Sequence, residues 1–452
     1  METQQFDTLI IGFGKGGKTL AAFLANKGMN VAVVEQSKEM YGGTCINVAC
    51  IPTKSLVLSA EHAASHHPST FEEKQAFYRH AIEEKQRLVT SLRQKNYDSL
   101  HTNPNVTVID GLARFVSPHE VHVVLSGTRD VIQIRAEHIV ISTGTKPFLP
   151  PIPGLKQSQR IYTSTTLMEQ KRLPHHLLVI GGGYVGLEFA SIYRAFGSEV
   201  TVFEQQGIFL PRQDRDVAAV VQQTMQAQGV QFHLHASVQH IHDEAAHTSV
   251  EFTDEQGQIH TLQGDAVLVA VGRAAVAAEL ALEQAHVETT ERGFVKVDEY
   301  LRTTTPNIWA VGDINGGPQF TYISLDDYRI VRDQFYGEGK RSTQSRQHVP
   351  SSIFITPTLS HVGLTEEEAL QHGYEVNIAK LPAAANTRAQ MLRETAGLLK
   401  AVVDARTHQI LGCTLYCAES NEVINTVAMA MRAHMDHQTL RDTIFTHPSV
   451  SE

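Results

Sequence analysis

Residues 8–35 read TLIIGFGKGGKTLAAFLANKGMNVAVVE, and this stretch decides the fold of the first half of the chain. The apolar run at 8–11 predicts a buried strand, a glycine-rich turn follows it, and residues 18–26 are compatible with a helix. A second apolar run at 31–34 predicts another strand, which ends at Glu35. An order of strand, glycine turn, helix and strand, with an acid about 20 residues after the turn, is typical of a dinucleotide-binding fingerprint.

The same unit occurs a second time. Residues 177–204 read LLVIGGGYVGLEFASIYRAFGSEVTVFE, and in both copies the acid follows the first glycine by 23 residues. The first glycine permits a tight turn, the second lets backbone N–H groups approach a pyrophosphate, and the third lets the helix pack on the strand. Each acid is expected to accept hydrogen bonds from a ribose hydroxyl. The two predicted dinucleotide sites, which together imply electron transfer, comprise Gly12, Gly14, Gly17 and Glu35, and Gly181, Gly183, Gly186 and Glu204.

The length of 452 residues predicts roughly three domains. Apolar strands that end in glycine at 138–144 and 266–272 close the two units, and the proline-rich segment 147–154 marks a linker. A further strand that ends at Asp313 suggests that the chain returns to the first domain. We therefore predict an α/β protein with two Rossmann-like dinucleotide-binding domains, 1–150 with 274–345 and 151–273, followed by a C-terminal α+β domain at 346–452.

Composition excludes several classes of partner. The chain has 38 basic and 48 acidic residues, a net charge of −10 and no long basic block, so we expect no nucleic-acid partner. No apolar stretch has the 18 or more residues of a spanning helix, so we expect no membrane. Four cysteines indicate a reducing compartment, and only seven residues precede the first predicted strand, which leaves little room for a targeting segment. We expect a cytoplasmic protein.

Cys45 and Cys50 are the candidate reactive pair. Buried free thiols, a metal site and a redox-active pair are the alternatives, and no further ligands at metal-binding spacing lie nearby. Residues five apart in a regular helix lie about 8–9 Å apart between Cα atoms, more than the ~7 Å that a disulfide tolerates. A bridge would therefore distort a helical turn and be easily reduced, and a helix N-terminus would lower the thiol pKa. These features favour a redox role.

At this point the chain resembles a known family. Residues 42–54, GGTCINVACIPTK, closely resemble the active-site signature of class I pyridine nucleotide-disulfide oxidoreductases such as glutathione reductase, dihydrolipoamide dehydrogenase and mercuric reductase. Both fingerprints, the Asp313 segment and THPSVSE at 446–452 occur in the family's order. KGGK at 15–18 and FTYISLDDY at 320–328 look most like the reactive-chlorine-resistance flavoproteins, a subgroup implied to reduce hypothiocyanous acid and related oxidants. Ala49 departs from the family's usual glycine, and we expect it to lie in the helix, where alanine is tolerated.

The resemblance implies roles for individual residues. FAD would occupy the first unit with Asp313 on its ribitol, and NAD(P)H would occupy the second. Cys50 would be the charge-transfer thiol and Cys45 the interchange thiol that faces substrate. The C-terminal domain would form a homodimer, in which His447 acts in trans as the acid or base. The other implied site residues are Lys54 paired with Glu188, Glu452 orienting His447, and the cofactor-binding positions Thr44, Thr143, Gly144, Thr321, Tyr184, Val185 and Gly272.

We therefore predict that electrons pass from NAD(P)H through FAD and the dithiol to a small oxidant, with hypothiocyanous acid or a related reactive-chlorine product favoured. The alternatives are reduction of Cu(II), Hg(II) or a small disulfide by the same dithiol, and a weakly catalytic flavoprotein that senses oxidants. Glu204 favours NADH over NADPH, although Arg212 or Arg215 could reach the same pocket. Phe320, Tyr322 and Tyr328 would narrow the substrate approach if they do not simply pack in the core. We expect no metal site and interpret Cys413 and Cys417 as core thiols.

Overall fold

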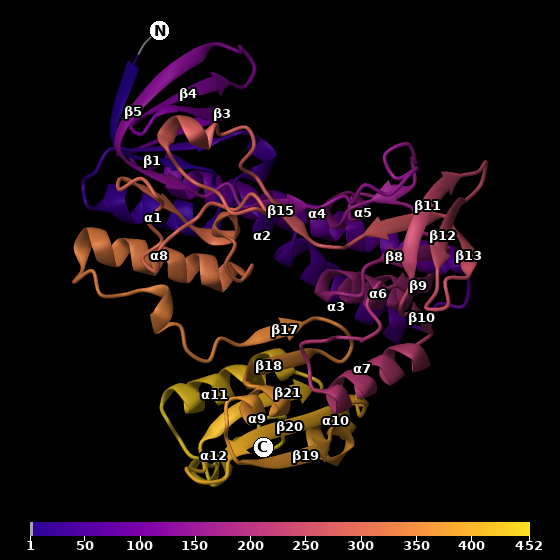
Figure 1. Cartoon of the computed structure of the whole chain (residues 1–452). Helices are drawn as coiled ribbons and strands as arrows, with labels where there is room; N and C mark the ends of the chain where they lie inside the picture. The colour runs from indigo at the N-terminus through magenta and orange to yellow at the C-terminus, as the bar shows by residue number, and fades with distance from the viewer. Residues whose placement is uncertain (1–2) are drawn as a thin grey trace. The chain divides into compact units, whose positions relative to one another are not determined.

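The computed structural model describes residues 3–452, which divide into two compact units (Figure 1). The first unit contains the chain up to Ser55, Ile82–Phe148 and Gly272–Arg346. The second contains Leu56–Ala81, Leu149–Val271 and Gln347–Glu452. The predicted domains at 151–273 and 346–452 fall in the second unit except for their end residues 272, 273 and 346, and the boundary between them stays a prediction.

The first unit is built on a sheet whose central strands are parallel. In it β1 (Thr3–Ile11) pairs with β2 (Val31–Glu35) and with β5 (Val131–Ile141), and β16 (Ile308–Ala310) extends β5. Val31 to Glu35 are all buried, which explains why the strand has no alternation of polar and apolar residues. Because these strands are parallel, their carboxyl ends and the turns that follow lie along one edge of the sheet. The rest of the sheet consists of β3 (Val106–Ser117) and β4 (Glu120–Leu125).

Two helices lie side by side on this sheet, α1 (Lys15–Asn26) and α8 (Thr321–Tyr336) (Figure 1). The apolar residues of α1 recur at helical spacing, and Leu20 and Leu24 are fully buried in a cluster that includes Ile330 of α8. The packing of α8 on α1 therefore holds a segment from position 321 onward against the first glycine turn.

The second unit repeats the parallel pattern. Its strands are ordered β10 (Val230–His233), β9 (Glu199–Phe203), β8 (His176–Ile180), β14 (Ala266–Val269) and β7 (Ile161–Tyr162). Helix α6 (Tyr184–Phe196) connects β8 to β9, and α7 (Arg215–Ala227) precedes β10. An antiparallel sheet of β11 (Ser237–Asp243), β12 (Thr248–Thr253) and β13 (Ile259–Gly264) follows.

The C-terminal part of the second unit is an antiparallel sheet with helices. Its strand order is β17 (Ser351–Ile353), β18 (Leu359–Gly363), β21 (Ile410–Tyr416), β20 (Leu398–Asp404) and β19 (Val376–Pro382). Helix α11 (Ser420–Arg432) packs on β18 and β21 and buries Ile424 and Met431 in the local core. This segment is α+β in character.

The remaining elements are short or connect these sheets. They are α2 (Thr44–Asn47), α3 (Cys50–Ser65), α4 (Phe71–His101), β6 (Thr145–Pro147) paired with β15 (Arg273–Ala275), α5 (Ser164–Leu167), α9 (Glu366–Gln371), α10 (Thr387–Leu392) and α12 (His437–Arg441). Across residues 3–452, no helix combines the length and the hydropathy needed to cross a bilayer.

Candidate active site

The two glycine turns have the same backbone geometry. Gly12 has φ +100° and Gly181 has φ +110°, a left-handed conformation that side chains rarely adopt. A Cβ added at Gly12 would lie 2.5 Å from the carbonyl oxygen of Ser142, and one added at Gly181 would lie 2.6 Å from that of Ala270. Both turns therefore require glycine, because the backbone has positive φ and because a Cβ atom would clash with a carbonyl oxygen.

The two acids are also held alike. The carboxylate of Glu35 accepts hydrogen bonds from the N–H groups of Phe13 at 2.9 Å and Ser37 at 3.2 Å. That of Glu204 accepts from Gly182 and Gln206, both at 2.8 Å. Burial raises the pKa of Glu35, while the hydrogen bonds from the backbone oppose that shift. In each copy the carboxylate thus braces the glycine turn from the end of the second strand.

The helices after these turns begin in a form that fits a pyrophosphate. Gly14 and Gly183 are the N-caps of α1 and α6, and neither cap residue has a side chain to accept from the first N–H groups of its helix. In α1 the N–H of Gly16 donates to Oγ of Ser324 on α8 at 3.0 Å. Backbone donors at a helix N-terminus with no side-chain acceptor are suited to an anionic group. A Cβ at Gly183 would meet open space, so the backbone there can be approached closely. The residues present therefore fit the dinucleotides that the sequence predicts.

The dithiol lies where the short helix α2 is followed by the longer helix α3. Cys45 is in α2, and Cys50 is the first residue of α3. Our expectation that Ala49 lies in the helix is wrong, because the chain leaves α2 at Val48 (φ −141°) and bends at Ala49 before α3 begins. Ala49 does not have positive φ, so alanine is not strained there. The break lets the two thiols, both free, approach within hydrogen-bonding reach of each other.

Pro52 is the sequence signal for this break. It lies in the first turn of α3, where its missing N–H has no helical partner to lose. In a helix continuing from α2, the same nitrogen would face the carbonyl of Val48 without a proton to donate. The proline therefore favours a new helix start at Cys50.

The two thiols ionise very differently. A hydrogen bond from Cys45, together with Thr321 and the charge of Lys54, lowers the pKa of Cys50 to about 6 against the opposing effect of burial. The Sγ atom of Cys50 lies 3.4 Å from Oγ1 of Thr321, at the start of α8. The same hydrogen bond, burial and the charge on Cys50 raise the pKa of Cys45. We expected helix N-termini to keep the dithiol largely ionised, and the structure assigns the readily formed thiolate to Cys50 alone.

A close backbone contact fixes the dithiol against the first glycine turn. Gly43 precedes α2 with φ +77°, and a Cβ added there would lie 2.7 Å from the Cα atom of Gly14. The segment that carries Cys45 is therefore seated directly on the N-cap of α1. This contact places the dithiol next to the predicted pyrophosphate site.

We expect Gly43→Ala to destabilise the protein by about 3 kcal/mol, because a left-handed conformation and a backbone clash act together. Gly28→Ala is the matched control, since Gly28 has φ +89° but nothing within 4 Å of an added Cβ. It should lose only about 1 kcal/mol from conformational strain. Thermal unfolding midpoints of the two variants check this, and equal losses would show that the Gly43 contact is loose.

Asp313 is held by a network that sequence reasoning missed. The hydroxyl of Thr145 donates to Oδ2 of Asp313 at 2.8 Å and accepts from Nε of Arg273 at 2.7 Å. Burial lowers the pKa of Arg273, and the charge of Asp313 opposes that shift. Fully buried Asp327 accepts from the N–H of Gly312 at 2.6 Å and is paired with Arg346. The turn that carries Asp313 is therefore fixed from both sides.

The other predicted cofactor positions lie at element ends. Thr143 and Gly144 follow β5, and the Thr143 hydroxyl donates to the carbonyl of Val276 at 2.7 Å. The rest stand at the first residue of α2 (Thr44), the first two residues of α6 (Tyr184 and Val185), and three residues after β14 (Gly272). Their contacts with a cofactor stay predictions.

The remaining predicted catalytic residues form local contacts. Nδ1 of His447 lies 2.8 Å from Oε1 of Glu452, and the histidine side chain is 69% exposed. The carboxylate of Glu188 accepts from the N–H of Phe354 at 2.9 Å. The charge of Lys54 acts on Cys50. The Lys54–Glu188 pair and the action of His447 on a dithiol stay predictions.

The aromatic residues after position 320 have different surroundings. The rings of Phe320 and Tyr322 stack at 5.0 Å, and Tyr322 is 42% exposed. Tyr328 instead packs edge-on against Phe23 of α1 and lies partly buried against the core. Of the three aromatic residues, only Phe320 and Tyr322 can therefore narrow the path of a substrate.

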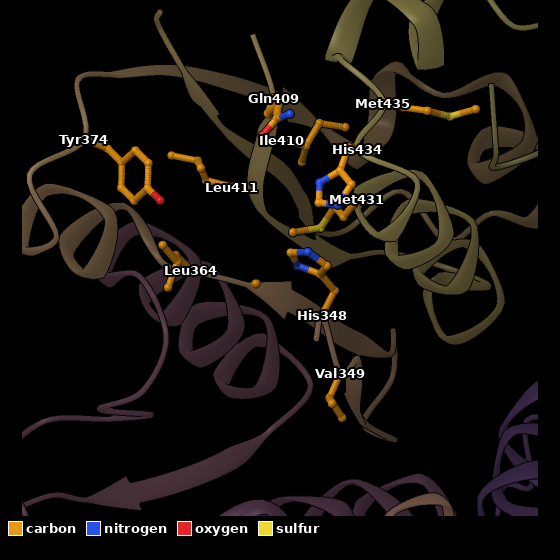
Figure 2. Close-up of a pocket in the computed structure, with 11 residues that line it drawn as sticks. His348, Val349, Leu364, Tyr374, Gln409, Ile410, Leu411, Met431, His434 and Met435 are labelled. Atoms are coloured by element: carbon orange, nitrogen blue, oxygen red, sulfur yellow. The ribbon is translucent and has the colours of Figure 1, made fainter. Parts of the chain in front are cut away.

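A cavity of about 480 Å³ lies in the C-terminal part of the second unit (Figure 2). Its wall includes His348, Met431 and His434, and none of the residues predicted for catalysis or cofactor binding lines it. Among the residues described, no group of three or more His, Cys, Asp and Glu side chains could hold a metal ion. Cys413 and Cys417 are buried, and burial raises the pKa of both.

Comparison with known proteins gives matches over nearly the whole chain. Residues 6–327 match the pyridine nucleotide-disulphide oxidoreductase family, and residues 349–452 match the dimerisation domain of that family. The probable pyridine nucleotide-disulfide oxidoreductase RclA of Escherichia coli K12 is 48% identical, over 99% of this chain and 97% of that protein. Dihydrolipoyl dehydrogenase of Bacillus subtilis 168 is 33% identical, over 99% of this chain and 94% of that protein. A solved structure described as the Cu(II) complex of the HOCl-induced flavoprotein disulfide reductase RclA from E. coli has a TM-score of 0.92 and 46% identity, over 99% of this chain and 97% of that chain.

Proposed function

Because the chain belongs to the pyridine nucleotide-disulphide oxidoreductase family and is an oxidoreductase, we propose that it reduces a small oxidant, hypothiocyanous acid or a related reactive-chlorine product, with electrons from NADH. The observation that carries the proposal is the dithiol, in which a low-pKa thiol at Cys50 lies beside a second thiol at Cys45. The similarity to an HOCl-induced flavoprotein disulfide reductase supports the choice of oxidant. We place the activity in the cytoplasm, where thiols stay reduced.

Membership of the family implies FAD and NAD(P)H. Bound FAD supplies two-electron transfer between the nicotinamide and the dithiol. We assign its pyrophosphate to the N-terminus of α1, its ribose to Glu35 and its ribitol to Asp313. The N-terminus of α6 and Glu204 would hold the nicotinamide dinucleotide. The Lys54–Glu188 pair belongs to the same proposal.

The reduced dithiol can carry out the reaction in two displacements. The Cys45 thiolate attacks the sulfur of hypothiocyanous acid, forming a bond from Sγ to the thiocyanate sulfur and releasing hydroxide, which takes up a proton to become water. The Cys50 thiolate then attacks Sγ of Cys45 and expels thiocyanate, leaving the Cys45–Cys50 disulfide. The two thiols lose two electrons and the oxidant gains them. The low pKa of Cys50 keeps the resolving thiolate formed at neutral pH.

We assign acid–base work to His447, which Glu452 orients through Nδ1 at 2.8 Å. Glu452 has its pKa lowered by hydrogen bonds from Ser449 and His447, so it stays ionised and favours one tautomer of the ring. The dimerisation domain at 349–452 supports a homodimer. In that dimer His447 would serve the dithiol of the partner subunit.

We expect NADH to exceed NADPH in kcat/KM by about tenfold or more, because Glu204 accepts from a ribose hydroxyl and repels a phosphate. Arg215 is committed elsewhere, since its guanidinium donates to the carbonyls of Phe209, Leu210 and Gln213. Arg212 is exposed and is the remaining candidate for a phosphate contact. Steady-state kinetics with both nucleotides check this. Arg212→Ala is the control: because we expect Glu204 to set the preference, this change should alter kcat/KM for neither nucleotide. Equal or better use of NADPH would contradict the role of Glu204.

Reduction of Cu(II) is the second candidate, because a relative of 46% identity has been solved as a Cu(II) complex. Reduction of hypothiocyanous acid and reduction of Cu(II) would both use the Cys45–Cys50 dithiol. The third candidate is a weakly catalytic flavoprotein that senses oxidants. A steady-state screen of the purified protein against hypothiocyanous acid, oxidised glutathione, lipoamide, Hg(II) and Cu(II) tests all three. Fast turnover with hypothiocyanous acid supports our proposal, whereas a preference for Cu(II), or no turnover with any oxidant, would contradict it.

A further inference from the structure

Lys18 lies one turn into α1, with its head group at the start of the dithiol segment. Its Nζ atom donates to the carbonyl oxygen of Gly42 at 3.4 Å and to the side-chain oxygen of Asn96 on α4. Gly42 is three residues before Cys45, and Gly43 between them is the residue seated on Gly14. The oxygens of Gly42 and Asn96, both neutral, therefore hold the ammonium beside the turn that precedes α2. Asn96 is fixed in turn by donating to the carbonyl of Leu92 at 2.7 Å.

The titratable groups that act on Lys18 and Cys45 include Lys15 on α1 and Cys50 on α3. Burial and the neighbouring charge of Lys15 lower the pKa of Lys18 to about 8, and Cys45 opposes that shift. Lys18 in turn acts on Cys45 and lowers its pKa against the effects of Cys50 and burial. Thr321 on α8 also lowers the pKa of Cys45 through a hydrogen bond. Lys18 is therefore the cation that acts on Cys45, as Lys54 acts on Cys50.

The thiolate of Cys45 needs a nearby cation to stabilise it. Cys50 ionises first, and its negative charge disfavours a second thiolate beside it. Attack on an oxidant nevertheless requires the thiolate of Cys45, since the thiolate is the nucleophilic form of cysteine. Among the residues that the structure describes, the partly buried ammonium of Lys18 has no carboxylate partner, so its field acts on the thiol, whereas a salt-bridged lysine would be largely neutralised.

We propose that Lys18 is a positioning residue of the active site, whose ammonium stabilises the thiolate of Cys45 as it attacks the oxidant. This inference rests on the proposed function, because it assigns Cys45 as the nucleophile. Lys18 transfers no proton in this step and is mostly protonated at neutral pH, below its pKa of about 8. The proton from Cys45 leaves before the attack and is returned, through the acid–base group assigned to His447, to the released hydroxide. The KGGK segment at 15–18 therefore does more than form the glycine turn, because its last residue, Lys18, stabilises the thiolate of Cys45.

The test measures the ionisation of Cys45 without any oxidant. In the FAD-loaded homodimer carrying Cys50→Ser, the rate of alkylation of Cys45 by iodoacetamide is followed against pH by mass spectrometry of the Cys45 peptide. We expect Lys18→Met to move the midpoint upward by about one pH unit, which is about a tenfold slower alkylation at neutral pH. Lys18→Arg should restore the midpoint, and Lys27→Met, which removes an exposed cation at the end of the same helix, should leave it unchanged.

Asn96→Asp is a second variant that keeps the lysine and its packing. A carboxylate at this position would pair with the ammonium, so we expect the midpoint to move upward as in Lys18→Met. Superimposable profiles for Lys18→Met and the parent protein would overturn the proposal, as would an equal shift in Lys27→Met. Because no oxidant is present, a shifted profile in a protein that reduces no oxidant would contradict only the proposed function.

Discussion

Replacing Cys45 with serine is expected to lower kcat/KM for the oxidant by at least about a thousandfold. Serine keeps the size of the side chain but cannot form a thiolate or a disulfide, so neither displacement can occur. The flavin should stay bound, because the glycine turn, Glu35 and Asp313 are untouched. Steady-state turnover of NADH with hypothiocyanous acid measures the loss.

Cys413→Ser is the matched control for this loss. Cys413 lies on β21, buried among apolar residues, and we expect its replacement to leave kcat/KM unchanged even if stability falls. The pH dependence gives a second check. Because the pKa of Cys50 is lowered to about 6, its thiolate is present above that pH and is lost below it, so activity should fall on acidification. A Cys45→Ser variant that keeps more than a tenth of the activity would contradict the role of the dithiol.

The second large effect is expected from mixed dimers. A Cys45→Ser homodimer and a His447→Ala homodimer should each be nearly inactive, since each lacks one half of every site. Mixing unfolded chains and refolding them with FAD should restore about a quarter of the parent activity, because half of the dimers are mixed and each has one complete site. The recovered activity is read from NADH turnover with the oxidant.

Two Cys45→Ser preparations mixed in the same way serve as the control and should recover nothing. Recovery in the true mixture supports a histidine that acts across the dimer. Its absence, in a mixture shown by tagged chains to contain mixed dimers, would place His447 with the dithiol of its own chain or outside the reaction.

The sequence predicted the parts of the site that depend on local geometry. A tight turn that needs positive φ at Gly12 and Gly181, and an acid at the end of the next strand, are both encoded within 28 consecutive residues. The expected α/β fold with two Rossmann-like units is confirmed by the family match and by a solved relative of TM-score 0.92.

The parts that were missed depend on contacts between distant segments. Asp327 supports Gly312 because α8 packs on the turn that carries Asp313, and Arg273 reaches Thr145 because β15 pairs with β6. The packing of α8 on α1 places Tyr328 edge-on against Phe23, which an aromatic-rich segment alone cannot reveal. The helix break before Cys50 was also missed, but it does not depend on distant contacts, because Pro52 indicates it within the same segment.

The most direct test of the account compares two substrates at saturating NADH. A small electrophilic oxidant needs little more than the nucleophile at Cys45, whereas glutathione disulfide needs an extended surface to hold its carboxylates. We expect kcat/KM for hypothiocyanous acid to exceed that for glutathione disulfide. An equal or higher value for glutathione disulfide would contradict it and make the protein a general disulfide reductase.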